Sequence, residues 1–277
     1  MLTFKAARAL GIISLVSVTA TTVAKPVAKP VATPARSSGV TYEVVMTTTS
    51  QPAGPAGAGY SMTARGMTDA KGSTRMEIVS VDGAAGGAFT VGDYYLSVDG
   101  KSTLVHVATK TYSDVLDQAA NVLKNMPPEI AAQLTLTDVT GKVEQVSGDE
   151  AIAGLSAEHH RVSLSYSMNV MGQSIPSTVV SDYWFAKLPV KFAIPIGGGP
   201  TKAPTVAGPM AGLVAKQFEL MPSLPDRTVI KSTSSTTLAI MGQNVVTSIT
   251  TEMKNIKEAN VDAALFVIPD GFTKVEK

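Results

Sequence analysis

Hydrophobic and polar residues alternate along most of this chain from about residue 39 onwards. Such alternation is typical of β-strands that bury one face, because neighbouring side chains of a strand point to opposite sides. Clusters of Gly, Pro and Asp interrupt the alternation, as they do at turns between antiparallel strands. The pattern predicts strands, joined by turns, at residues 41–48, 60–68, 73–81, 93–112, 134–147, 157–170, 174–187 and 236–253.

Two segments depart from this pattern and predict helices. Over residues 113–125 the apolar positions recur three or four residues apart, Ser113 is placed as an N-cap, and two prolines follow. The second candidate spans residues 209–220. It lies within residues 188–227, which are otherwise rich in Gly and Pro. Long segments of this kind inside compact domains are usually functional lids or disordered.

The Asp99-Gly100 pair predicts a tight hairpin, because a type I′ turn needs a positive φ angle at both central residues. Counting back from this turn places His106 opposite Asp93. Two roles stay open for the pair. His106 shares a strand face with Leu104, which favours a hydrogen-bonded histidine at the rim of the core. A hydrolase would instead require a nucleophilic Ser or Thr close to both residues.

A second hairpin is expected at Gly172-Gln173, where Gly in first position fits a type II′ turn. The resulting register places Arg161 opposite Trp184, in position for a cation–π contact. Asp182 lies diagonally opposite and can hold the guanidinium. We prefer this structural interpretation, but the same three side chains also define a possible polar site that grips a carboxylate or a sugar ring.

The adjacent histidines His159 and His160 raise the question of a metal site. Neighbouring residues of a strand point to opposite faces, so the two rings diverge and do not chelate one ion together. No cysteine and no His-x-x-x-His spacing supplies further zinc ligands. We therefore predict no metal here, and the hairpin register makes His160 a neighbour of Phe185 at the margin of a core.

The N-terminus has the order of a secretory signal peptide. Lys5 and Arg8 precede an apolar run at residues 9–18, and small residues follow, with Ala20 or Ala24 as the cleavage position. A membrane anchor fits less well, because the run is shorter than the roughly 20 residues that a spanning helix needs. The chain is therefore expected to be exported to the periplasm or secreted.

The sequence divides into a signal peptide at 1–24, a linker rich in Pro, Ala and Lys at 25–38, and one domain at 39–277. With no cysteine, the mature chain has no disulfide and no lipid-modified cysteine, so packing must stabilise it. Removing Lys5 and Arg8 from the 23 basic residues leaves 21 against 22 acidic residues. This balance argues against nucleic acid as a partner. We expect a monomer.

The sequence contains no complete catalytic template. The run at 197–199 lacks the Lys-Ser/Thr of a P-loop, and Gly100-Lys101-Ser102 has Tyr95 where the upstream Gly would stand. There is no Gly-x-Ser-x-Gly motif and no cysteine nucleophile. We therefore predict no catalytic residue, no cofactor and no enzymatic activity.

Two longer stretches carry a family resemblance, one around "DEAIAGLSAEHHRVSLSY" with the later "DYWFAK", and one at the closing "ALFVIPDGFTKVEK". They contribute Ala151 to Gly154, Tyr166, Trp184, Phe266, Pro269, Gly271 and Phe272. With these motifs the segment 39–277 resembles LolA-like proteins, nearest to a bacterial family of unknown function. The family pattern carries no catalytic residue.

The resemblance implies an α+β fold, a curved antiparallel sheet in the form of a half-open barrel, with a few helices covering the concave face. It also implies a periplasmic carrier whose concavity takes acyl chains, and hence a lipid or acylated ligand as partner. The methionines Met46, Met62, Met168 and Met241 suit such a ligand, although each also fits a core position. The apolar face expected to line the pocket comprises Val162, Leu164, Tyr166, Met168 and Val170 of one strand and Leu123 of the first predicted helix.

Two classes of function remain. The first is a non-catalytic envelope protein that binds a lipid-like or other apolar ligand beneath a helical lid. The second is a structural or protein-interaction module of the cell envelope whose outer strand face is rich in Ser and Thr. Bound lipid in the purified protein distinguishes the first from the second.

Overall fold

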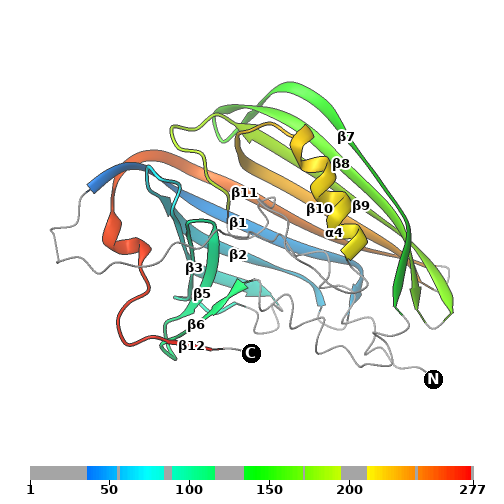
Figure 1. Ribbon diagram of the computed structural model, residues 1–277, viewed down its shortest axis with the longest axis horizontal. Helices are drawn as coiled ribbons and strands as arrows, with labels where there is room; N and C mark the ends of the chain where they lie inside the picture. The colour runs from blue at the N-terminus through cyan, green and yellow to red at the C-terminus, as the bar shows by residue number, and fades with distance from the viewer. Residues whose placement is uncertain are drawn as a thin grey trace.

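In the computed structural model, the described residues form one twelve-stranded sheet in the order β12-β6-β5-β4-β3-β2-β1-β11-β10-β9-β8-β7 (Figure 1). The structure describes residues 36–54, 57–83, 89–115, 134–170, 172–194, 211–240 and 243–275. The strands are β1 (Arg36–Gly54), β2 (Gly57–Thr68), β3 (Thr74–Gly83), β4 (Tyr94–Val98), β5 (Lys101–His106), β6 (Thr111–Asp114), β7 (Thr135–Ile152), β8 (Leu155–Val170), β9 (Gln173–Ala186), β10 (Thr228–Ile240), β11 (Gln243–Asp262) and β12 (Thr273–Lys274).

The sheet consists of two meanders joined by their outermost long strands. Strands β1 to β6 follow one another in space as in sequence, and so do β7 to β11. The antiparallel pairing of β1 with β11 connects them, running from Arg36 opposite Asp262 to Gln51 opposite Val246. All neighbouring strands are antiparallel except the short pair β12 and β6. The predicted antiparallel sheet is therefore confirmed, and β1 begins slightly before Gly39.

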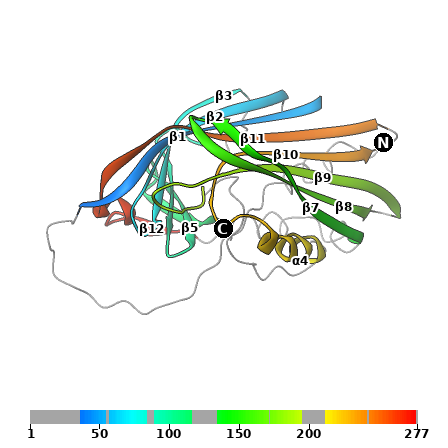
Figure 2. The same cartoon turned by 90° about the horizontal axis from the view of Figure 1, so that it is seen from above.

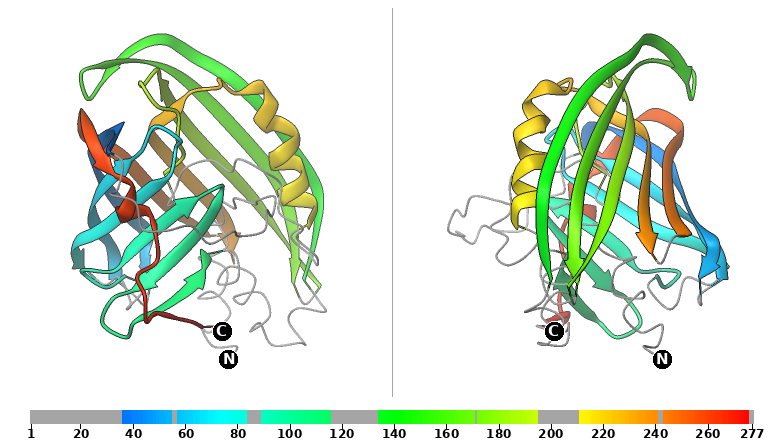
Figure 3. Two further views of the ribbon diagram at one scale, coloured as in Figure 1. Left: turned by 60° about the vertical axis from the view of Figure 1, so that its left-hand side comes forward. Right: turned by 90° about the vertical axis from the view of Figure 1, so that its right-hand side faces the viewer.

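The sheet curves but does not close. Seen from above, β5 and β12 at one end and the helix α4 (Ala211–Leu220) at the other lie on the same side of the central strands (Figure 2). Helix α4 lies against β7 and β8 (Figure 3). We call the face that α4 covers the inner face and the opposite one the outer face.

The described residues contain little helical structure. Among the described residues, α4 is the one α-helix, accompanied by the 3-10 turns η2 (Met221–Ser223) and η3 (Ala263–Phe266). Helix α4 confirms the candidate at 209–220. Most of the helix expected at 113–125 lies outside the described residues, but Ser113 pairs with Leu104 within β6 and is no N-cap.

Both meanders contain hairpins with positive φ angles at the turn. Asp99 and Gly100 have φ angles of 50° and 75°, as a type I′ turn requires. Ala153 and Gly154 show the same combination between β7 and β8, with angles of 51° and 79°.

The turn between β8 and β9 differs from the expected one. Val170 pairs with Gln173, so the register moves by two positions from the expected one. Arg161 therefore lies opposite Asp182 and not opposite Trp184. Because side chains alternate with a period of two, this error leaves every residue on its predicted face.

Apolar clusters lie on both faces. The largest lies on the inner face and gathers side chains of β1, β2, β3 and β11, among them Tyr42, Met46 and Met62. A second inner cluster lies beneath α4. A third lies on the outer face at β4 and β5, where Phe266, Ile268 and Phe272 from the C-terminal segment cover Tyr94 and Val105. The C-terminal motif that carries the family resemblance is thus part of the hydrophobic core.

We expect Gly66→Ala to destabilise the protein. Tyr42 covers Gly66 across the β1–β2 pair, and a Cβ added there would lie 2.0 Å from the buried ring. Overpacking of this kind costs about 1 to 3 kcal/mol. Urea unfolding measures the loss. Gly212→Ala in α4 is the control, because nothing lies within 4 Å of its added Cβ and alanine favours helix. A Gly66 variant as stable as wild type would contradict the packing described.

Candidate functional site

The inner face carries an apolar surface made largely of methionine. Met46, Met62, Met76 and Met253 are each 0% exposed and come from four neighbouring strands. Met46 and Met62 lie directly opposite each other in the β1–β2 pair. Unbranched thioether side chains adapt to irregular apolar shapes more readily than branched ones. This surface is therefore suited to contact a flexible apolar chain.

A segment without regular secondary structure, residues 187–194, packs on this surface, and we call it the strap. Its apolar side chains occur at every second position and contact the methionine cluster: Leu188, Val190, Phe192 and Ile194. The ring of Phe192 stacks on Tyr42 with 5.0 Å between centroids. The backbone N–H of Phe192 donates to Thr228 Oγ1 at 3.3 Å, and Lys191 forms an ion pair with Asp226.

The strand residues that the sequence assigns to ligand binding lie on the same inner face, nearer to α4. Val162, Leu164, Tyr166 and Met168 are buried, and Val170 is half-buried. Tyr166 and Met168 share a cluster with Leu213 of α4. The remaining candidate, Leu123, lies outside the described residues. The structure thus places these side chains under the helix, and their contact with a ligand stays a prediction.

A row of polar side chains crosses the inner face between the two apolar clusters, and we call it the polar belt. His160 pairs with Tyr183, Tyr183 with Ser232, Ser232 with Thr251, and Thr251 with Met46, so the row leads from β8 to the methionine surface. His160, Ser232 and Thr251 are buried. Burial raises the pKa of Tyr183 against the effect of its hydrogen bond to Ser181, which keeps the phenol protonated.

The sequence did not predict the polar belt, because the apolar pattern of one strand says nothing about its neighbours. The strand 157–170 has an apolar inner face next to His160, which suggested an apolar face throughout. Several inward positions of β9 and β10 are instead occupied by hydroxyl residues, as in the pair Ser181 and Ser234, whose oxygens lie 3.0 Å apart. Only the cross-strand register shows that these residues share a face with Val162.

His160 itself occupies the predicted margin of a core. Its ring meets that of Phe185 edge-on with 5.8 Å between centroids. Its Nε2 lies 3.7 Å from Glu158 Oε2, too far for a hydrogen bond, and Glu158 is engaged by Arg227 at 2.7 Å. His159 points to the outer face, so the two histidines diverge as expected. Among the described residues, no group of three or more His, Cys, Asp or Glu side chains is arranged to hold a metal ion.

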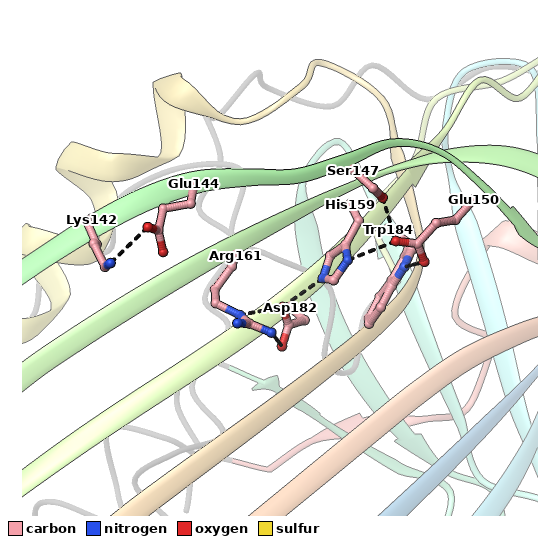
Figure 4. A network of polar contacts seen from close by, with 8 residues as sticks. All are labelled: Lys142, Glu144, Ser147, Glu150, His159, Arg161, Asp182 and Trp184. Atoms are coloured by element: carbon pink, nitrogen blue, oxygen red, sulfur yellow. Dashed lines mark hydrogen bonds and ion pairs between the residues drawn. The ribbon is translucent and has the colours of Figure 1, made fainter.

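The residues of the predicted polar site belong to a network of polar contacts on the outer face (Figure 4). Arg161 donates to both oxygens of Asp182, from Nε at 2.9 Å and from Nη2 at 3.2 Å. These bonds raise the pKa of Arg161. Asp182 thus holds the guanidinium as predicted, whereas the expected contact of Arg161 with Trp184 is replaced. His159 stacks on the indole at 4.2 Å, and Lys231 Nζ lies 4.7 Å from the ring centroid.

His159 links two carboxylates within this network. Its Nδ1 lies 3.1 Å from Glu150 Oε1 and its Nε2 lies 2.7 Å from Asp182 Oδ1. Ionised carboxylates only accept hydrogen bonds, so the donor in these contacts is the imidazole. Trp184 Nε1 donates to Glu150 Oε2 at 2.6 Å. Hydrogen bonds from Ser147 first, then Trp184 and His159, lower the pKa of Glu150.

These contacts explain the network as a connection between strands. Glu150 belongs to β7, His159 to β8 and Asp182 to β9, so the chain of hydrogen bonds ties the edge strand to its neighbours. Every charged group named in it already has a partner. The arrangement therefore favours the structural interpretation of the Arg161, Asp182 and Trp184 group over a ligand site.

His106 and Asp93 meet as the hairpin register predicts. His106 Nδ1 lies 2.6 Å from Asp93 Oδ2, and Asp93 Oδ1 accepts from the backbone N–H of Val107 at 3.0 Å. Asp93 is buried and His106 is half-buried at the edge of the inner face. Both carboxylate oxygens thus hold the end of the β4–β5 hairpin, which fits a histidine at the rim of the core.

None of the described helices is long and apolar enough to span a membrane.

No protein-family model matches the chain, and none of the curated proteins matches it. Among solved structures, a LolA superfamily protein from Nitrosomonas europaea is similar over 83% of this chain and 90% of its own, with 7% identity and a TM-score of 0.30. A chain of the Pseudomonas aeruginosa MucA/MucB complex is similar over 80% of this chain and 94% of its own, with 8% identity and a TM-score of 0.22.

The first of these structures belongs to the superfamily that the sequence resembles. Such low identities bear on the fold alone, and at these TM-scores neither likeness supports an argument about function.

Glu150→Gln should make stability less dependent on pH on the acid side. The folded-state pKa of Glu150 is lowered, so its charge stabilises the fold above the pKa of a free glutamate. This contribution is lost as the pH falls through the lowered value. The variant should therefore be less stable than wild type at pH 7, and the difference should shrink as the pH falls below the ordinary pKa of a glutamate.

The measurement is urea unfolding from pH 3 to pH 7. Glu144→Gln is the matched control, because Glu144 pairs with the exposed Lys142 at 2.9 Å on the same strand and exposed pairs contribute little. Identical pH profiles for the two variants would show that the network adds nothing to stability.

Proposed function

We propose that this chain is an exported, non-catalytic binding protein for a lipid-like ligand whose acyl chain lies on the inner face of the sheet. One observation carries the proposal. Within the part of the chain that the structure describes, the methionine surface is covered by the strap, an irregular segment with apolar side chains at alternate positions, where a domain core would place a second layer of regular structure.

The strap resembles a bound acyl chain in its length and in the apolar groups that it presents to the methionine surface. Its eight residues, 187–194, would span about 26 Å in extended form. It presents Phe192 and Ile194 to the methionines while Lys187 and Lys191 are exposed. An acyl chain of the ligand can replace these apolar contacts, because the methionine thioethers adapt to a new shape.

A second function has support from the outer face. Hydroxyl pairs bridge β10 and β11 there, with Thr233 Oγ1 and Thr250 Oγ1 at 3.3 Å and Ser235 Oγ and Ser248 Oγ at 2.7 Å. These pairs form an uncharged polar surface that suits contact with an envelope polymer or a protein. An interaction module of this kind needs no bound lipid, so lipid analysis of the purified protein distinguishes the two functions.

Export should remove the N-terminus at Ala20 or Ala24. Lys5, Arg8 and the apolar run at 9–18 have the order that signal peptidase substrates share. Intact-mass measurement of the protein recovered from the envelope or the medium determines the first residue. A mature protein that still begins at Met1 would contradict both the signal peptide and the proposed location.

Phe192→Ala should increase the affinity for a fluorescent fatty acid while lowering stability. The substitution removes the ring that stacks on Tyr42, which weakens the strap as a competitor of the ligand. Loss of a buried Phe side chain costs about 3 to 5 kcal/mol. Fluorescence titration and urea unfolding measure the two effects, and mass spectrometry of organic extracts identifies lipids that co-purify with the wild type.

Phe272→Ala is the control for this experiment. Phe272 packs in the outer-face cluster, so its loss should reduce stability without increasing affinity. Weaker fatty-acid binding by the Phe192 variant would show that the strap does not compete with the ligand. A folded wild type that binds no lipid and carries none would leave the interaction module as the better proposal.

A further inference from the structure

Three buried polar atoms on the inner face have no hydrogen-bond partner in the structure: His160 Nε2, Thr251 Oγ1 and Thr48 Oγ1. Thr251 is 2% exposed and His160 is 8% exposed. A buried polar atom without a partner costs about 1 to 3 kcal/mol. Such atoms are rare in folded proteins and call for a water molecule or a ligand as partner.

The three atoms belong to adjoining rows of the sheet. His160 and Thr251 stand at the two ends of the polar belt, with Tyr183 and Ser232 between them. Thr251 pairs with Met46, and Thr48 follows two residues after Met46 on the same face of β1. The unpaired hydroxyls therefore adjoin the methionine surface.

The charges around the belt determine which polar group it accepts. The belt itself consists of His160, Tyr183, Ser232 and Thr251, and it contains no lysine or arginine. Lys231, next to Ser232 in sequence, lies on the outer face over Trp184. The nearest carboxylate, Glu158, is engaged by Arg227. A free carboxylate of a ligand at Thr251 would be buried without a lysine or arginine to pair with it, which is costly.

We infer that the ligand is a neutral acyl ester or amide whose carbonyl group lies at the polar belt while its acyl chain extends over the methionines. This inference rests on the proposed function and specifies its ligand class. The hydroxyl of Thr251 donates to the carbonyl oxygen, and Thr48, diagonally opposite on the neighbouring strand, binds an adjoining polar atom of the linkage. His160 lies three strands away from Thr251 and does not contact the same group. A hydroxyl both donates and accepts, so the site suits an ester and an amide alike.

The test compares three ligands of equal chain length: monopalmitoylglycerol, palmitate and hexadecane. Wild-type protein should bind monopalmitoylglycerol at least tenfold more tightly than palmitate at pH 7. Thr251→Val and Thr48→Val should each weaken monopalmitoylglycerol binding about three- to tenfold, the effect of one hydrogen bond. Hexadecane binding should stay unchanged in both variants, because the alkane has no polar group. Titration calorimetry or native mass spectrometry gives the affinities.

Thr47→Val is the matched control. Thr47 adjoins both Met46 and Thr48 in sequence but is exposed on the outer face, so its variant should bind all three ligands like the wild type. Thermal unfolding provides a second readout. Replacing an unpaired buried hydroxyl by an isosteric methyl group leaves stability unchanged or raises it, so weaker ester binding by Thr251→Val would not come from unfolding.

The outcomes separate this inference from the proposed function. If hexadecane and palmitate bind but the valine variants bind monopalmitoylglycerol like the wild type, the hydroxyls hold only water and the inference fails. Tighter binding of palmitate than of the ester would also overturn it. If the folded wild type binds none of the three ligands, the proposed function itself fails.

Discussion

The pairing of β1 with β11 is the constraint on which the rest of the structure depends. It joins the first long strand to the last one across about two hundred residues of sequence, and among the described strands it is the one pairing that connects β1–β6 with β7–β11. The methionine surface crosses this seam, because Met46 and Met62 belong to one meander and Met253 to the other. The polar belt crosses it too, where Thr251 meets Met46. The candidate site therefore exists only when the two halves of the sheet have joined.

The side chains of a β-strand alternate between its two faces, and this alternation lets the sequence predict which face of the sheet each residue occupies. The faces of β8 are correct although the register at Gly172 is wrong by two positions, because an even shift preserves the face of every residue. The Asp99-Gly100 turn even gives the register, and with it the contact of His106 with Asp93. Local signals suffice for such features.

The features that sequence analysis missed are those that depend on distant strands. The inner face of β8 is apolar, whereas Ser181 and Ser234 continue the same face on β9 and β10, and no local pattern relates one strand to the other. The same holds for Trp184, whose partners His159 and Lys231 come from two other strands. Candidate ligand contacts deduced from one strand therefore describe only part of the face.

The two sides of the sheet treat polar groups in opposite ways. On the outer face, each charged group of the Glu150, His159 and Asp182 network has a hydrogen-bond partner. The edge strand β7 beside this network carries charged residues and register shifts, which hinder its pairing with a strand of another chain. On the inner face, Thr251 is buried without a partner although a valine would fill the same space. In a core selected for stability alone, an unpaired buried hydroxyl would be replaced by an apolar group of the same size. The position of Thr251 beside the methionine surface is explained when the polar belt and the apolar surface together match one amphipathic molecule.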